Sequence, residues 1–301
     1  MTRRTTVIYL AIIGVLLALV LIWYVASFRA VEPEPVIFDG QRALSDVQTQ
    51  VAFGPRIVGS EGHAKVEEWI RTELESAGWT VAVQDTQQMG HPVLNIIAKR
   101  NDQDPQIILG AHYDTRMIAD QDPDPANHTK PVPGANDGAS GVAVLLELAR
   151  TLPDDTPPLW LVFFDTEDDG NIEGWDWILG SRAFVQALQF KPQAVLVVDM
   201  IGDADLNIYL ERNSDKALRT EIWNTAASLG YDKVFIVQEK HSMLDDHTPF
   251  LQAGIPAVDI IDFDYPYWHT IQDTPDKVSA KSLQIVGQTL STWITEQNQQ
   301  P

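Results

Sequence analysis

Short apolar runs alternate with longer segments of helical periodicity along residues 40–301. Apolar runs of roughly four to eight residues bounded by turn residues predict buried strands, and apolar residues three or four apart predict helices. The predicted strands are residues 80–83, 93–98, 106–111, 159–164, 194–198, 206–210, 234–237 and 256–261. The predicted helices are residues 40–78 with a break at Gly54-Pro55, 142–152, a segment opened by Gly180-Ser181-Arg182, 216–229, 245–253 and 279–295. This alternation predicts one α/β domain.

The amino-terminal segment has a different pattern. Residues 7–26 carry no charge and are almost wholly apolar, and about 20 such residues can span a bilayer core. A cleaved signal peptide would have a shorter apolar core and a small-residue cleavage site, for which Val25-Ala26-Ser27 is a poor candidate. We therefore expect residues 1–28 to be an uncleaved transmembrane anchor.

The residues on either side of the predicted anchor indicate its orientation and its connection to the domain. Arg3 and Arg4 precede the apolar run, which predicts a cytoplasmic amino terminus and places the bulk of the chain outside the cytoplasm. Residues 29–39 contain Pro33 and Pro35, so we interpret them as a short stiff tether. Residues 40–301 then form the domain.

The composition of the chain excludes several kinds of partner and metal site. The formal charge of −21 argues against a nucleic-acid partner, because the chain would repel a phosphate backbone. The chain has no cysteine, which excludes disulfides and thiolate metal sites. Any bound metal must be held by His, Asp or Glu.

Polar residues gather just past the predicted strands. The apolar run 159–164 is followed by Asp165, Glu167 and Asp168, and functional groups in open α/β sheets collect at the carboxyl ends of strands. A solvated acidic loop is the simpler alternative for this cluster taken alone.

Five positions together favour a metal site over that alternative. A single His or Asp just past a predicted strand or at a helix start is more often structural, and Asp137 could simply cap a helix. Five of them in a chain without thiols suit one or two zinc ions bound through nitrogen and oxygen. Asp114 could orient a metal-bound imidazole, and Glu167 could act as general base. The five are His112, Asp137, Asp168, Asp199 and His269.

At these positions the chain resembles the metallopeptidase family of zinc aminopeptidases and zinc-dependent glutaminyl cyclases. The resemblance covers residues 40–295 and implies a central mixed, mostly parallel sheet flanked by helices. It implies that Asp137, Asp168 and His269 bind zinc, and that Glu167 is the general base. His112 and Asp199 match the positions that complete a second zinc site in the aminopeptidases. The motifs that carry it are GAHYDT, PGANDGASG, FFDTEDDG, VVDMIGD and AGIPAVDIIDFDYPYWHTIQDTPDKVS.

The family contains two chemistries, and both remain open at this point. A cyclase uses one zinc to convert an amino-terminal glutamine to pyroglutamate, whereas an aminopeptidase uses two and removes the first residue of a peptide. Three features resemble the cyclases. Trp268 directly precedes His269, and Trp175 would form a wall of the pocket. Asp245 would contact the substrate and the acid network with Asp199. Either enzyme acts on peptide or protein amino termini. A non-catalytic ectodomain on the same fold is a third alternative.

Overall fold

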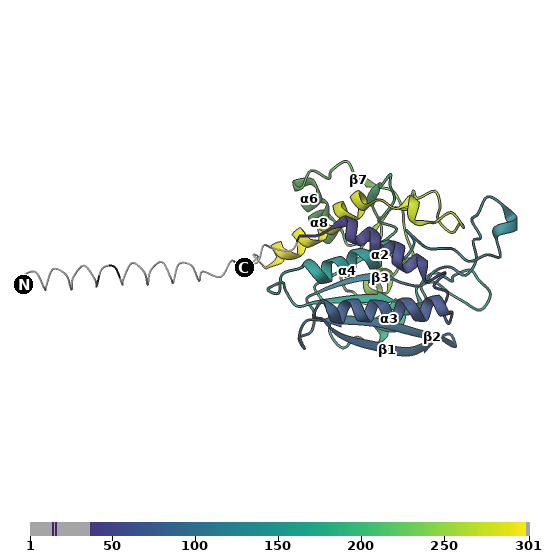
Figure 1. Cartoon of the computed structure of the whole chain (residues 1–301), viewed down its shortest axis with the longest axis horizontal. Helices are drawn as coiled ribbons and strands as arrows, with labels where there is room; N and C mark the ends of the chain where they lie inside the picture. The colour runs from purple at the N-terminus through teal and green to yellow at the C-terminus, as the bar shows by residue number, and fades with distance from the viewer. Residues whose placement is uncertain (1–13, 15, 17–36, 299–301) are drawn as a thin grey trace, which may run out of the picture. The chain divides into compact units, whose positions relative to one another are not determined.

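The computed structural model describes residues 14, 16 and 37–298 (Figure 1). Apart from two residues, the predicted anchor at 1–28 lies outside the described residues, as does most of the predicted tether at 29–39. Within the described part of the chain, no helix is both long enough and apolar enough to cross a membrane. The described residues 37–298 form one compact unit.

A six-stranded mixed sheet forms the centre of this unit, with strand order β1-β2-β4-β3-β5-β8. Strands β3, β4, β5 and β8 are mutually parallel, and β1 and β2 add an antiparallel edge. A separate parallel pair is formed by β6 and β7. The strands are β1 Thr80–Gln88, β2 His91–Lys99, β3 Ile107–His112, β4 Leu159–Phe164, β5 Ala194–Asp199, β6 Ile208–Leu210, β7 Phe235–Glu239 and β8 Ala257–Ile261. The predicted single α/β domain with a mixed sheet is confirmed.

Helices cover both faces of the sheet. One face packs on α2, α3, α4, α6 and α8 through the larger core cluster. The other face packs on α5 and α7, where the ring centroids of Phe184 and Phe250 lie 6.0 Å apart. Apolar side chains on both faces explain why the central strands are apolar without alternation. The helices are α2 Gly40–Ala52, α3 Glu61–Ser76, α4 Ala139–Thr151, α5 Leu179–Ala187, α6 Lys216–Ser228, α7 Thr248–Gln252 and α8 Ala280–Gln297, with 3-10 turns at η1 Pro125–Asn127 and η2 Pro275–Lys277.

The register of the parallel strands brings their carboxyl ends to one edge. His112, the last residue of β3, pairs with Phe164, the last residue of β4. Asp199 likewise pairs with Ile261 at the ends of β5 and β8. The loops that follow these four strands therefore start side by side, and they carry the predicted site residues.

Candidate active site

The five predicted ligands converge at this edge of the sheet. They form two groups that share one carboxylate, and within each group the candidate ligand atoms lie within 4.8 Å of one another. His112 ends β3, Asp168 follows β4, Asp199 ends β5, His269 follows β8 and Asp137 precedes α4. The first group is Asp137, Asp168 and His269; the second is His112, Asp137 and Asp199.

The first group has the properties of a cation site. His269 Nε2 lies 2.8 Å from Asp168 Oδ1 and 3.7 Å from Asp137 Oδ2. His269 Nε2 and Asp137 Oδ2 are both buried and have no hydrogen-bond partner within the described residues. Buried polar atoms are normally satisfied, so these two atoms and the Asp168 carboxylate fit a divalent ion with nitrogen and oxygen ligands.

The second group is closed by hydrogen bonds of its own. His112 Nε2 lies 3.1 Å from Asp137 Oδ1 and donates to Asp199 Oδ1 at 3.2 Å. Its Nδ1 lies 3.5 Å from Asp114 Oδ1. Burial alone would lower the pKa of His112, but the three carboxylates raise it well above its ordinary value. The three carboxylates thus favour the protonated form of the imidazole.

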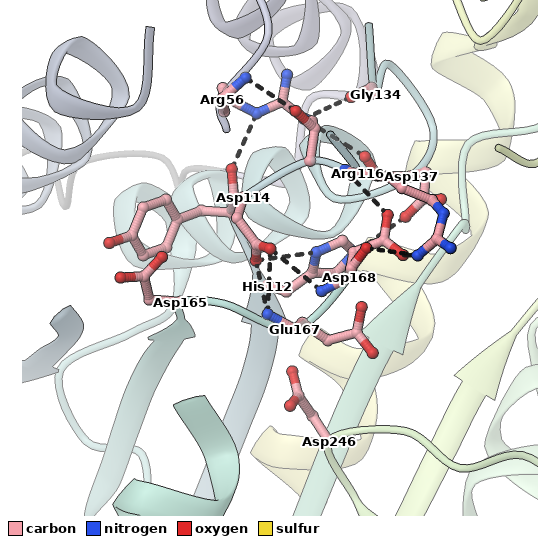
Figure 2. A network of polar contacts seen from close by, with 12 residues as sticks. Arg56, His112, Asp114, Arg116, Gly134, Asp137, Asp165, Glu167, Asp168 and Asp246 are labelled. Atoms are coloured by element: carbon pink, nitrogen blue, oxygen red, sulfur yellow. Dashed lines mark hydrogen bonds and ion pairs between the residues drawn. The ribbon is translucent and has the colours of Figure 1, made fainter. Parts of the chain in front are cut away.

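Asp114 orients the loop that carries Glu167. Its carboxylate accepts hydrogen bonds from the backbone N–H of Glu167 at 3.1 Å and of Asp168 at 3.2 Å (Figure 2). The two N–H groups following β4 therefore point at Asp114, which leaves the Glu167 and Asp168 side chains free to face the site.

Arg116 and Asp120 support the first group from the long loop after β3. The Arg116 backbone N–H donates to Asp168 Oδ2 at 3.1 Å, and its guanidinium donates to the Asp168 carbonyl at 2.9 Å. The same guanidinium makes a bidentate pair with Asp120, whose Oδ1 lies 3.5 Å from His269 Nδ1. Sequence reasoning missed both residues; the only signal was their place in a long loop directly after the HYD motif.

Asp137 is held through its backbone. Asp273 accepts hydrogen bonds from the N–H groups of Asn136 and Asp137 at 2.8 and 3.1 Å. The fully buried Arg56 donates to the carbonyls of Gly134 and Tyr113. Asp273 and Arg56 also escaped the sequence analysis.

Gly134 permits this close packing. Its φ of +68° favours glycine, and a Cβ there would come within 2.2 Å of Thr115 and 2.7 Å of Arg56.

Three site loops contain residues in the left-handed region. Thr166, Met200 and His269 follow β4, β5 and β8 and have φ values of 56°, 48° and 54°. Such backbone is unfavourable for non-glycine residues and persists where the surroundings impose it, often at functional sites. Tight packing therefore fixes the direction of the loops bearing Glu167 and His269.

A pocket of about 180 Å³ opens onto both groups. Asp137, Glu167, Asp168, Asp199 and Asp245 supply its acidic lining, and Trp177, Trp268, Phe263, Met200, Met243, Leu244 and Ile261 supply its apolar lining. The Trp177 ring stacks on His269 with a centroid distance of 6.0 Å. Trp175, the expected pocket wall, instead stacks on His91 at 3.5 Å, so the structure brings Trp177 to the pocket in its place.

Glu167 lies at the inner wall of this pocket in a buried acidic environment. Burial raises the pKa of its carboxyl well above the ordinary value, His112 opposes that rise, and Asp168, Asp245 and Asp246 add to it. Figure 2 shows Asp246 beside Glu167. A carboxyl group whose proton affinity is raised in this way suits proton transfer near neutral pH.

Glu211 anchors the segment that brings Met243, Leu244 and Asp245 to the pocket. Its Oε1 accepts from the Met243 N–H at 2.9 Å, and its Oε2 lies 3.6 Å from Nε2 of the fully buried His247. Burial would raise the pKa of Glu211, but His247 and backbone N–H groups lower it to about 2.

We therefore expect an acid-dependent contribution of Glu211 to stability. Because the pKa of Glu211 is lower in the folded chain than in the unfolded chain, its contribution is complete above about pH 5 and is lost as the pH falls towards 2. Glu211→Gln should lower the free energy of unfolding at pH 7 by about 2 kcal/mol. Denaturant titrations of both proteins from pH 7 to 3 should show the difference shrinking; a difference that stays constant with pH would contradict this assignment.

The chain is similar to known proteins over most of this domain. The profile of peptidase family M28 matches residues 95–294. A glutaminyl cyclase from Porphyromonas gingivalis has a crystal structure that superposes with a TM-score of 0.81 at 36% identity, covering 87% of this chain and 99% of that one. A leucine aminopeptidase precursor from Bacteroides thetaiotaomicron superposes with a TM-score of 0.81 at 32% identity, covering 87% and 98%. A glutaminyl-peptide cyclotransferase from Gloydius blomhoffii is 25% identical over 80% of this chain and 77% of its own length.

Proposed function

Because the chain belongs to peptidase family M28, we propose that it is a zinc-dependent glutaminyl-peptide cyclotransferase that converts amino-terminal glutamine to pyroglutamate with release of ammonia. The small pocket walled by Trp177 and Trp268 beside Glu167 is the observation that carries this proposal. Intramolecular cyclisation needs the reacting groups held close together, and flat aromatic walls around a small volume favour a folded glutamine side chain. The 36% identity to a glutaminyl cyclase supports the same activity.

Asp137, Asp168 and His269 would hold the zinc ion. When bound there, zinc acts as a Lewis acid towards the side-chain amide of the substrate. We propose one ion, because this group contains two candidate ligand atoms, His269 Nε2 and Asp137 Oδ2, that are buried without a hydrogen-bond partner in the described part of the chain. In the second group, His112 Nε2 already has a hydrogen-bond partner in Asp199.

Glu167 would move the proton. The α-amine of the substrate attacks the side-chain amide carbon, the new C–N bond closes the ring, and the bond to the amide nitrogen breaks. Glu167 accepts the proton that the amine loses and delivers it to the departing ammonia, so it ends each cycle unchanged. Asp245 and Asp199 line the same pocket, where their acceptor oxygens would orient the α-amine.

An aminopeptidase is the second candidate, and one observation favours it. The second ligand group is complete, with His112 Nε2 and the carboxylates of Asp137 and Asp199 within 4.8 Å of one another. Two ions and a hydrolytic reaction would fit that set. A coupled assay for ammonia tests the proposed function: a glutamine-initiated tripeptide should release one ammonia per molecule and no free amino acid, whereas release of free glutamine would favour the aminopeptidase.

Trp268 provides a test of the pocket. Its ring packs edge-on against Phe263 with a centroid distance of 5.0 Å and lines the pocket without offering a metal ligand. We expect Trp268→Ala to lower kcat/KM for a glutamine-initiated peptide about tenfold, because an aromatic contact contributes roughly 0.5–1.5 kcal/mol beyond its buried area. Zinc content, measured by atomic absorption, should not change.

Trp175→Ala is the matched control, because Trp175 lies outside the pocket lining and stacks on His91. It should retain near-normal kcat/KM. Equal losses in the two variants would mean that Trp268 acts only through packing.

The amino-terminal sequence supports a proposal for where the enzyme is located. We propose that residues 1–28 anchor the chain in the membrane with the catalytic domain outside the cytoplasm, on the basis of the uncharged run 7–26 and the preceding Arg3 and Arg4. Protease added to intact cells with a permeabilised outer layer should digest the domain, and protection of the domain would contradict this orientation.

A further inference from the structure

A second hollow adjoins the pocket between α5 and α7. Its volume is about 310 Å³. Ile178, Val185, Leu244 and Pro249 provide apolar walls, and Arg182 and Gln252 provide polar groups at its sides. On α5 the lining residues Arg182 and Val185 lie three positions apart, so they share one face of that helix, and Ile178 directly precedes it. We call this hollow the α5–α7 groove.

The groove and the pocket adjoin at Leu244. Leu244 lines both hollows and is 47% exposed, unusual for a leucine beside a buried acidic centre. Ile178 directly follows Trp177, the tryptophan that stacks on His269. Neighbouring residues of one segment therefore line the two hollows.

The junction between the two hollows is rigid. Ile178 has a φ of 57°, a conformation rare for a β-branched residue. Its N–H donates to the Glu167 carbonyl at 2.9 Å, and the Leu179 N–H donates to the Thr166 carbonyl at 3.0 Å. The groove wall is thus bonded to the loop that carries the general base, and the two hollows keep a fixed relation.

We propose that the α5–α7 groove binds the residues that follow the amino-terminal glutamine of the substrate, and that it selects an apolar side chain at the second or third position. This inference rests on the proposed function, since it takes the first residue to sit in the pocket. Because the exposed Leu244 lines both hollows, a peptide that leaves the pocket over Leu244 reaches the groove, so the occupant is the same peptide. The apolar walls favour an aliphatic side chain, whose burial is favourable in proportion to the area removed from water.

Kinetics with three substrates test this proposal on the zinc-loaded full chain. Glutamine amide probes the pocket alone. Gln-Leu-Leu-amide adds two residues with apolar side chains, and Gln-Gly-Gly-amide adds two residues without side chains. We expect the leucine peptide to have a kcat/KM at least about fivefold above that of the glycine peptide, through a lower KM. A difference of this size in kcat/KM is the usual effect of burying part of an aliphatic side chain.

Gln252→Trp should fill the groove from the exposed end of α7. It should abolish the preference for the leucine peptide and leave glutamine amide unaffected. Gln186→Trp, which enters from the α5 side, should do the same. Gln189→Trp is the matched control, because Gln189 is exposed and does not line the groove.

Two results would overturn the groove assignment. One is a wild-type enzyme with equal kcat/KM for both tripeptides, and the other is a preference that survives both groove-filling variants. Failure of the proposed function gives a different pattern, namely no cyclisation of glutamine amide by the wild type. In that case the groove assignment is tested with leucine amide, Leu-Leu-Leu-amide and Leu-Gly-Gly-amide, measured by the release of free leucine. The ratio of kcat/KM between the two tripeptides then decides the assignment in the same way.

Discussion

Replacing Glu167 with glutamine is expected to lower turnover of a glutamine-initiated peptide by about two orders of magnitude or more while zinc remains bound. General acid–base groups contribute rate factors of roughly 10²–10⁴, and glutamine has the same shape but cannot accept a proton. The backbone N–H groups of residues 167 and 168 would still donate to Asp114. The Asp168 carboxylate would therefore keep its place. Steady-state kinetics and zinc analysis on the same preparation give both quantities.

Glu173→Gln is the matched control for this experiment. Glu173 is an exposed glutamate in the same loop and lies outside the pocket lining. Its substitution should leave kcat and zinc content unchanged. Near-normal turnover in Glu167→Gln would remove Glu167 from the proton-transfer role, and loss of zinc would instead make it part of the metal site.

Replacing His269 with alanine is expected to abolish zinc binding and activity together. His269 supplies the only nitrogen donor of the first ligand group in the described part of the chain, and its Nε2 lies 2.8 Å from Asp168 Oδ1. Burial would lower the pKa of His269, but Asp168 and Asp120 raise it to about 9 when no ion balances them. Without the imidazole, two carboxylates would remain close together and unpaired, so the variant could also lose stability.

Asp168→Asn separates metal loss from unfolding, because it keeps the side-chain shape and removes the charge. It should bind zinc more weakly than the wild type, as measured by competition with a chelator, while keeping the wild-type circular dichroism spectrum. His128→Ala should retain zinc, since that histidine contacts the Asp122 carbonyl outside both groups. Unchanged zinc content in His269→Ala would place the metal elsewhere.

The fold was predictable where apolar runs report burial directly. The strand Leu159–Phe164 is apolar throughout because both faces are covered, and its predicted and observed bounds agree. β1 extends to Gln88, beyond the predicted end at 83. Its second half pairs with β2 at the sheet edge, where polar side chains reach solvent, so hydropathy gave no signal there.

The site was predictable to the extent that it sits at strand ends. His112 and Asp199 end buried strands, and that position, taken together with the other three candidate ligands, suggested them. Arg116, Asp120 and Asp273 act through contacts between loops distant in sequence, which no local pattern encodes. The exchange of Trp175 for Trp177 has a similar cause, since residues in an irregular loop have no periodicity that fixes which side chain faces inward.

The central claim is that the pocket cyclises glutamine. The most direct test incubates the zinc-loaded protein with a glutamine-initiated peptide and a leucine-initiated peptide of otherwise identical sequence and follows both by mass spectrometry. The account predicts loss of the mass of one ammonia from the glutamine peptide and no change in the leucine peptide. Loss of the first residue from either peptide would contradict it and would identify an aminopeptidase that uses both ligand groups.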